Sequence, residues 1–316
     1  MSTPARSPAA VRASLTDRLG ARAKATGQSV NLVRRQFVMS RFLTRVFDAD
    51  PDLWILKGGI GMMVRLPQSR YSKDIDLLIA NDTADPIEEL RRTVRDHHLD
   101  HFRFEVGPPR PLADQKGSKV TVIALLGGRT FDTFSIDIVD SRRELVGQVE
   151  RHPIPRLVDT DDFTPETSVL LYPLADQIAD KLCAMYEVHG AASTASGRYR
   201  DLVDLLLIAM FLPIDLATTA QAVERERTVR GIPALPTTLV SPGPSWTTHW
   251  SANAKKSPLT SEHHDLDTAL AVAGNCYNHI LAALPTAQRN AEWDHQRRTW
   301  MQDRPSADVR TADPAT

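Results

Sequence analysis

Two aspartates, Asp74 and Asp76, stand one residue apart in a segment with the composition of a strand, residues 74–79. Side chains two apart on a strand point to the same face of a sheet, so both carboxylates can reach one site while Ile75 and Leu77 face the core. Magnesium prefers hard oxygen ligands and often takes one or two carboxylates together with substrate phosphates. The pair therefore indicates a metal site, although an isolated Asp-x-Asp is also common on an exposed strand as solvated charge.

A glycine pair upstream indicates a turn that could hold phosphate. Residues 53–56 form a short apolar run typical of a buried strand, and Lys57-Gly58-Gly59 ends it with residues that let the backbone turn sharply. Residues 60–66 are expected to form a short helix with free N–H groups at its first turn. A triphosphate could then lie against Gly58 and Gly59, with Lys57 adding positive charge.

A third carboxylate, Asp137, lies inside the alternating run 134–139, which has strand character. A carboxylate between apolar neighbours in a strand needs a partner such as a metal ion. Asp132 and Asp140 compete with it, but they flank the run and resemble turn residues. If this strand pairs beside strand 74–79, three carboxylates converge.

Two amphipathic segments follow. Residues 172–187 carry apolar side chains at helical spacing with Lys181 in the middle, and residues 198–207 form a very apolar helix with Asp201 and Asp204 on one face. By composition Lys181 is a surface lysine. Acids on so apolar a helix, however, tend to have assigned partners.

Taken in order, these motifs resemble the AbiEii/AbiGii family of nucleotidyltransferase toxins, which includes the mycobacterial MenT enzymes. The resemblance covers about residues 53 to 207. It rests on five segments in the family's order: Leu-Lys-Gly-Gly, Ser-Lys-Asp-Ile-Asp-Leu, Ile-Asp-Ile, Ile-Ala-Asp-Lys-Leu-Cys-Ala and Arg-Tyr-Arg-Asp-Leu-Val-Asp-Leu.

What the resemblance implies is an α/β fold: a polymerase-beta-like nucleotidyltransferase domain with a mixed sheet, followed by a C-terminal helical domain. The implied activity adds a nucleoside monophosphate from an NTP to the 3′ end of tRNA, with Mg²⁺ or Mn²⁺ as cofactor, and so blocks aminoacylation and translation. The implied partners are tRNA, the NTP and a cognate AbiEi-like antitoxin. Which NTP is used does not follow from any motif.

The resemblance also implies residue roles. Gly58 and Gly59 match the phosphate-contacting turn, and Asp74 and Asp76 match the paired metal ligands. Lys181 matches a lysine expected on the nucleotide phosphates, where a compact ammonium suits phosphate binding.

Asp201 matches the aspartate of the last motif, whose role is near the reacting centre. Asp204 is the alternative match for that aspartate and is also expected to contact the nucleotide. Asp137 is similar to the third acid of the wider superfamily, and it either ligates the metal or supports the site. Ser72 stands two residues before the first aspartate, where a hydroxyl in the resembling toxins can be phosphorylated by an antitoxin. A phosphate there would repel the nucleotide, whereas the plainer interpretation is a turn serine.

Composition agrees with a cytoplasmic enzyme without a membrane partner. The chain has 316 residues, 42% of them hydrophobic and 24% charged. Its two cysteines, Cys183 and Cys276, form no disulfide or zinc pattern. The longest apolar stretch, residues 205–214, is interrupted by proline and is too short to span a bilayer.

The expected organisation is a flexible basic arm (1–30), a nucleotidyltransferase domain (31–160), a helical domain (161–302) and a disordered tail (303–316). Residues 1–50 hold nine basic side chains and three acids, which suits either nucleic-acid contact or a solvated helix face. Within the helical domain, residues 231–260 read as a loop whose Trp246 and Trp250 either pin it to a core or stack on a base. Helices are expected at 265–284 and 286–301, and the His97-His98 and His263-His264 pairs are interpreted as surface residues.

Two other functions fit the same residues. A nucleotidyltransferase that modifies an antibiotic or a protein hydroxyl would use the same acids with a different acceptor surface. A non-catalytic interaction module would not depend on Asp76.

Overall fold

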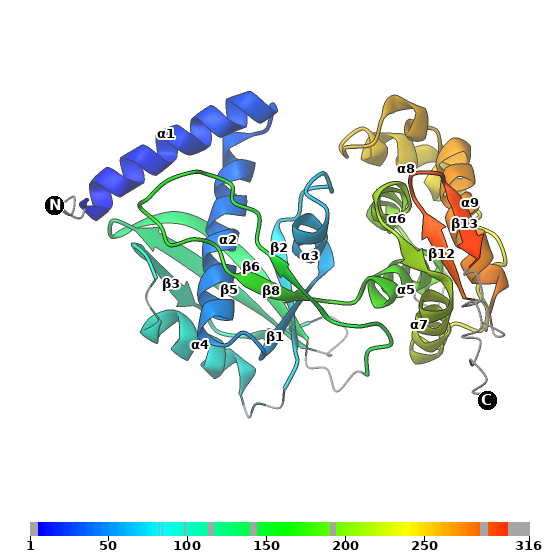
Figure 1. Ribbon diagram of the computed structural model, residues 1–316, viewed down its shortest axis with the longest axis horizontal. Coiled ribbons are helices and arrows are strands. Elements are labelled where there is room, and N and C mark those ends of the chain that lie inside the picture. Colours follow the sequence, from blue (N-terminus) through cyan, green and yellow to red (C-terminus); the bar gives the residue numbers. More distant parts are fainter. Residues whose placement is uncertain are drawn as a thin grey trace, which may run out of the picture. The chain divides into compact units, whose positions relative to one another are not determined.

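The computed structural model describes residues 6–81, 83, 85–97, 99–112, 117–139, 144–189, 194–284 and 290–302. The chain divides into two compact units, Met1–Pro173 and Leu174–Thr316 (Figure 1). The division falls after Pro173 and not after residue 160, because the strand β8 (Ser168–Leu171) belongs to the sheet of the first unit. The expected start of the helical domain at residue 161 is therefore wrong for residues 161–173, which include β8. The tail 303–316 lies outside the described residues.

A mixed sheet forms the centre of the first unit, as predicted. Its strand order is β3-β5-β6-β2-β1-β8-β7, with β4 also paired to β5. Two pairs, β2 with β6 and β1 with β8, are parallel, and the others are antiparallel. The bounds are β1 Trp54–Lys57, β2 Asp74–Ile79, β3 Phe102–Val106, β4 Arg110–Pro111, β5 Gly117–Leu126, β6 Arg129–Val139 and β7 Glu150–Pro153.

Alternation along β2 and β6 separates a core face from a polar face. Ile75 and Leu77 are fully buried, while Asp74 and Asp76, which alternate with them, are half-buried. The same alternation in β6 buries Ile136 and Ile138 and leaves Asp137 half-buried. The predicted facing of both strands is therefore confirmed.

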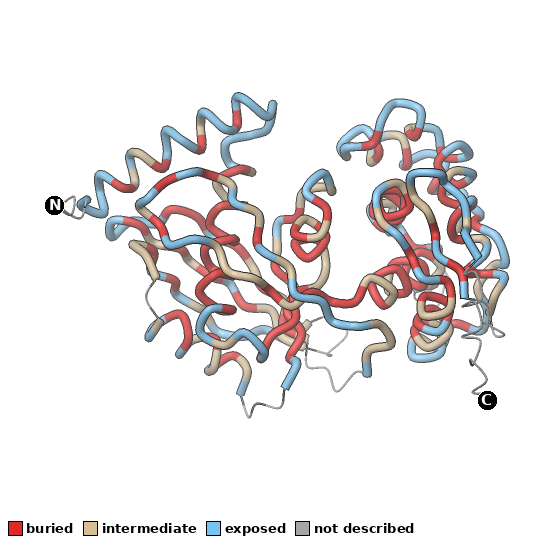
Figure 2. Tube along the Cα trace, viewed as in Figure 1, coloured by how far each residue is buried: buried red, intermediate tan, exposed pale blue. Residues whose placement is uncertain are grey.

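Helix α2 (Val30–Ala49) packs against the core face of this sheet, and Figure 2 shows it buried along most of its length. Its Phe42 meets the rings of Phe104 on β3 and Phe134 on β6 edge-on, at centroid distances of 5.2 and 5.4 Å. The unit is completed by α3 (Gly58–Arg65) and α4 (Pro86–Asp96).

The N-terminal arm is a helix, α1 (Pro8–Thr26), so the prediction of a flexible segment over 1–30 is wrong for these residues. Every fourth position is apolar and buried: Val11, Leu15, Leu19 and Ala23. Ser7 caps the helix, because its hydroxyl accepts the N–H of Ala10, and proline occupies the first turn.

Most of the positive charge in residues 1–50 serves the fold. The Arg12 guanidinium donates to three carbonyls around the β5–β6 turn, and Arg41 and Arg45 are fully buried against Asp100, with N–O distances of 2.8 and 3.0 Å. Seven of the nine basic residues make such intramolecular contacts: Arg6, Arg12, Arg18, Arg34, Arg35, Arg41 and Arg45. This segment therefore offers much less free positive charge to nucleic acid than its composition suggests.

The second unit is mainly helical, as predicted. Its helices are α5 Leu174–Tyr186, α6 Tyr199–Phe211, α7 Leu216–Val229, α8 Pro244–Ala254 and α9 Leu266–Ala282, with a 3-10 turn at Ser261–His264. Short strands accompany them: β9 Val188–His189, β10 Thr194–Ala195, β11 Ile214–Asp215, β12 Ala291–Asp294 and β13 Thr299–Gln302. Among the described helices of both units, none is long and apolar enough to cross a membrane.

Two predictions in this unit are wrong. The expected helix 286–301 is the hairpin β12–β13 over its described part, because Asp294 accepts the N–H groups of Gln296 and Arg297 and turns the chain. The expected loop 231–260 contains α8, which starts at Pro244, since proline is well tolerated at a first helical position.

The tryptophans of α8 anchor it to the core. Trp246 and Trp250 are fully buried, and their ring N–H groups donate to the carbonyls of Ser196 and His263. His263 is itself buried, which corrects its assignment to the surface. Of the other histidine pair, His98 lies outside the described residues.

Candidate functional site

Four charged side chains form a row across the sheet of the first unit. Lys57 on β1 pairs in register with Asp76 on β2, Asp76 with Asp137 on β6, and Asp137 with Lys119 on β5. Residues in register on neighbouring strands point to the same face of a sheet, so the order across this face is cation, anion, anion, cation. The predicted pairing of the two acidic strands is confirmed, and Asp74 lies on the same face, two residues before Asp76.

Lys119 balances the carboxylates electrostatically. Its ammonium lies 3.0 Å from an Asp137 carboxylate oxygen. This hydrogen bond raises the pKa of Lys119 against the opposing effect of partial burial, and the charges of Asp137, Asp74 and Asp76 raise it further. The ammonium is therefore in the field of all three acids. At the other end of the row, the Lys57 ammonium lies 4.9 Å from the centroid of the Tyr172 ring.

The glycine turn is packed directly on this row. Gly58 has a φ of +65°, which favours glycine, and a Cβ there would lie 1.9 Å from an Asp76 carboxylate oxygen. A Cβ on Gly59 would lie 2.5 Å from the Ser72 hydroxyl. The predicted sharp turn is present, and α3 starts at Gly58 rather than at Ile60. Any side chain at either position would displace a polar group of the site.

Ser72 connects the turn to the first aspartate. Its side chain is buried, with 7% of the residue surface exposed, and its hydroxyl donates to an Asp74 carboxylate oxygen at 3.1 Å. The serine thus holds the Asp74 carboxylate, and Gly59 packs against the serine.

The competing acid Asp132 has another role. It lies within β6 rather than in a turn, is buried, and pairs with Arg35 at 2.8 Å and with Arg34 at 3.8 Å. Asp140 lies outside the described residues. Asp137 is therefore the acid of this strand that belongs to the row.

The acids fit a divalent ion that takes part of its coordination from substrate. Within the described part of the chain, no group of three or more acidic, histidine or cysteine side chains is arranged to hold a metal ion by itself. Asp137 is instead engaged by Lys119. Asp74 and Asp76 nevertheless present hard oxygen donors beside the glycine turn, which suits magnesium because it commonly combines one or two carboxylates with phosphate oxygens.

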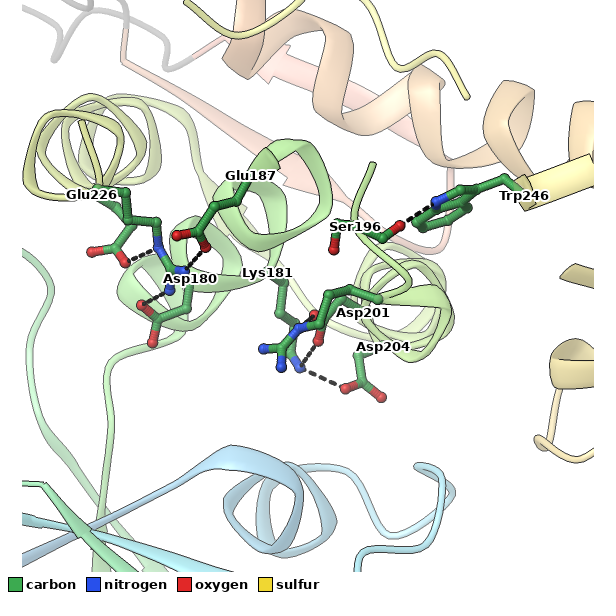
Figure 3. Close-up of polar contacts among 10 residues, drawn as sticks. Asp180, Lys181, Glu187, Ser196, Asp201, Asp204, Glu226 and Trp246 are labelled. Carbon is green, nitrogen blue, oxygen red and sulfur yellow. Dashed lines mark hydrogen bonds and ion pairs between the residues drawn. The ribbon is translucent and has the colours of Figure 1, made fainter. Parts of the chain in front are cut away.

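A second charged cluster lies in the second unit, between α5 and α6 (Figure 3). The Lys181 ammonium donates to Asp201 at 3.3 Å and to Asp204 at 2.5 Å, and all three side chains are buried. Arg198 donates from its Nε to the other Asp201 oxygen at 2.8 Å. Two cations thus match two carboxylates, which offsets the desolvation of the buried charges.

This cluster confirms that the acids of α6 have assigned partners and overturns the surface assignment of Lys181. Asp180, the neighbour of Lys181 in sequence, belongs to a separate network. Arg230, which caps the C-terminus of α7, pairs with Asp180 at 3.7 Å and with Glu226 and Glu187 at 2.6 Å each (Figure 3). The two networks fix α5 on both sides, so Lys181 is held in a defined position.

Sequence reasoning missed Lys119. Its position opposite Asp137 depends on the register of β5 against β6, and a lysine in an alternating strand looks like any solvent-facing residue. A lysine at a polar position of the strand preceding the Asp137 strand was the available signal.

Comparisons with known proteins identify the family and the fold. The family model described as nucleotidyl transferase AbiEii toxin, type IV TA system, matches residues 41–272. The structure is similar to MenT4, a nucleotidyltransferase toxin from Mycobacterium tuberculosis H37Rv, at a TM-score of 0.53 and 18% identity, covering 89% of this chain and 92% of that one. JHP933 from Helicobacter pylori is more distant, at 0.39 and 14%, with 64% and 81% covered. A search of curated proteins found no match. The chain therefore belongs to the AbiEii nucleotidyltransferase toxin family.

Proposed function

We propose that this AbiEii-family toxin uses Mg²⁺ or Mn²⁺ to transfer a nucleoside monophosphate from an NTP to the 3′ end of tRNA. The observation that carries the proposal is the charged row Lys57–Asp76–Asp137–Lys119 packed against the Gly58-Gly59 turn. In this reaction the terminal RNA hydroxyl attacks the α-phosphorus, an O–P bond forms, the bond to the β-phosphate breaks, and pyrophosphate leaves. The modified tRNA could no longer be aminoacylated, and an AbiEi-like antitoxin would counter the effect.

The first unit would hold the metal and the triphosphate. Asp74 and Asp76 would hold the ion, which when bound neutralises charge on the phosphates and activates the attacking oxygen. Gly58 and Gly59 allow phosphate oxygens to approach the backbone closely, with Lys57 nearby. Asp137 would support this arrangement by holding Lys119, since the two are 3.0 Å apart.

By the family resemblance, Lys181 would bind the nucleotide phosphates and Asp201 would accept the proton of the attacking hydroxyl. Asp204 would hold Lys181, a role that their 2.5 Å contact supports, and so contribute to the nucleotide site indirectly. Both oxygens of Asp201 are held, one by Lys181 and the other by Arg198, so the carboxylate has a defined position. To accept the proton, Asp201 would exchange one of these two contacts for the attacking hydroxyl.

Ser72 would be the point of control. A phosphate on its hydroxyl would put nearly two negative charges beside Asp74 and against Gly59, where the nucleotide phosphates would otherwise lie. Co-expression with the antitoxin followed by mass spectrometry tests this. Loss of activity with Ser72 unmodified would exclude the idea, whereas an active Ser72→Ala variant that resists the antitoxin would support it.

The activity is tested by incubating the purified protein with each labelled NTP, total tRNA, and either magnesium or a chelator. Asp76→Asn should abolish labelling, and Asp17→Asn on the exposed side of α1 is the matched control. Absence of label in RNA with all four nucleotides would refute the tRNA assignment. Label in a protein or in an aminoglycoside would favour the alternative acceptors, and a toxic effect that survives Asp76→Asn would favour a non-catalytic module.

A further inference from the structure

A small aromatic surface lies at the start of α6, next to the Lys181 cluster. It consists of Tyr199, Trp246 and His249, and we call it the aromatic platform. The Tyr199 ring lies 4.8 Å from that of Trp246 and 5.8 Å from that of His249, at interplanar angles of 58° and 31°. Trp246 is fully buried, Tyr199 is half-buried and His249 is exposed. Trp246 is thus the floor of the platform, and the other two rings are its accessible part.

The platform is held in place by hydrogen bonds from its floor and its edge. Trp246 donates its ring N–H to the carbonyl of Ser196 at 2.6 Å, which ties α8 to the segment leading into α6 (Figure 3). The His249 Nδ1 lies 2.8 Å from the carbonyl of Ser245, so this nitrogen carries the proton and the ring orientation is set. Rings fixed in this way lose little conformational freedom when a ligand stacks on them.

Two exposed arginines neighbour Tyr199 in sequence. Arg198 and Arg200 stand on either side of Tyr199 in sequence, and both are exposed, with 60% of the Arg198 side chain accessible. Arg198 also donates to Asp201, so the platform is continuous with the cluster to which the attacking hydroxyl is assigned. Core packing explains Trp246, but it does not explain an exposed histidine whose ring lies 5.8 Å from that of a half-buried tyrosine, with two exposed arginines next to that tyrosine in sequence.

We propose that Tyr199 and His249 stack on unpaired bases at the end of the acceptor RNA while Arg198 and Arg200 contact the flanking phosphates. The inference rests on the proposed function, in which RNA is the acceptor. Stacking on aromatic rings combined with cationic groups is the usual way of holding single strands without strict sequence choice. The surface is open rather than enclosing, which suits a strand better than the base of an NTP, since choice among nucleotides requires specific pocket contacts.

The test measures binding of a short, fluorescein-labelled single-stranded RNA to the full-length protein carrying Asp76→Asn, without NTP, so that no transfer occurs. Tyr199→Ala and His249→Ala should each weaken binding about tenfold, and Tyr199→Phe should bind like the parent. Arg200→Ala should weaken binding and lower the slope of log affinity against log salt by about one. Arg95→Ala, an exposed arginine of α4, is the matched control and should leave affinity unchanged.

Unchanged RNA affinity in Tyr199→Ala and His249→Ala would overturn the proposal. So would a higher KM for the NTP when the same substitutions are made in the protein with Asp76 intact and RNA affinity is unchanged, because the platform would then hold the nucleotide base. If Tyr199→Ala does not fold, judged by Trp emission and thermal unfolding, His249→Ala and Arg200→Ala decide the matter from the surface. If the parent labels RNA but the platform substitutions do not change RNA affinity, only the platform is refuted. If RNA affinity depends on the platform but no RNA is labelled, only the transfer reaction is refuted.

Discussion

Replacing Gly58 by alanine separates the strain of an unusual backbone from damage to the site. Gly58 and Gly27 both have a φ of +65°. A Cβ at Gly27, which caps α1, meets nothing within 4 Å, whereas a Cβ at Gly58 would lie 1.9 Å from an Asp76 carboxylate oxygen. Gly27→Ala therefore carries the backbone cost alone, and Gly58→Ala adds the clash.

The expected magnitudes differ for stability and for activity. Alanine in the left-handed region costs roughly 1–2 kcal/mol, so Gly27→Ala should lower the melting temperature by a few degrees, at about 2–4 °C per kcal/mol for a unit of this size. In Gly58→Ala the carboxylate must also move by about 1.5 Å to reach an ordinary contact of 3.4 Å. A displacement of about 1 Å in a reacting group costs on the order of 100-fold in rate.

The assay compares both variants with the parent in thermal unfolding, in nucleotidyl transfer and in Mn²⁺ binding. Gly27→Ala should lose stability but keep its kcat and its Mn²⁺ affinity. Gly58→Ala should be less stable than Gly27→Ala. Its kcat should fall about 100-fold, and it should bind Mn²⁺ more weakly than the parent. Equal activity and equal Mn²⁺ affinity in the two variants would refute the role given to Asp76 and to the glycine turn.

Three further predictions concern other parts of the chain. Gly59→Ala should destabilise the protein because its Cβ would lie 2.5 Å from the Ser72 hydroxyl, and Ser72→Gly in the same chain should restore much of the melting temperature; failure to restore it would place the strain elsewhere. Lys181→Met should lower the free energy of unfolding by about 3–5 kcal/mol because it leaves buried carboxylates unbalanced, and adding Asp204→Asn should recover stability in urea titrations but not transfer activity. Recovery of activity as well would make Lys181 purely structural. Burial lowers the pKa of His263, so its neutral form contributes stability above about pH 6.5 that is lost as the pH falls through the folded pKa. The parent should therefore lose more melting temperature than His263→Asn between about pH 7 and pH 5, and parallel curves would contradict this.

The acidic strands could be predicted because the sequence of each strand alone contains the signal. The alternation of polar and apolar residues around Asp76 and Asp137 determines on which face of the sheet the carboxylates lie. Their apolar neighbours indicate that these carboxylates need partners. Lys119 could not be predicted in the same way. Its partner is set by the register between β5 and β6, which depends on the whole sheet and not on the residues beside the lysine.

The errors have physical causes of the same kind. The arginines of residues 1–50 suggest free positive charge when only the sequence is considered. The sequence does not show that Arg41 and Arg45 pair with Asp100, or that Arg12 donates to carbonyls of the β5–β6 turn. Pro244 read as part of a loop because proline breaks a helix interior, although it also starts helices well. For the arginines, the tertiary partners decide whether the charge is free. For Pro244, its position at the first turn of α8 decides that it begins a helix.

The charged row also explains how the fold can hold two acids side by side on one face before any substrate binds. Asp76 and Asp137 stand side by side in register, where like charges repel each other. Lys57 and Lys119 stand in register at the two ends of the same row, so each acid has a cation on its outer side. The sheet can therefore form without a bound ion, unlike a structural metal site whose ligands fold around the metal. Under the proposed function, such a site would release and bind an ion and phosphates at each turnover, because Asp76 and Asp137 are balanced by Lys57 and Lys119 of the protein itself.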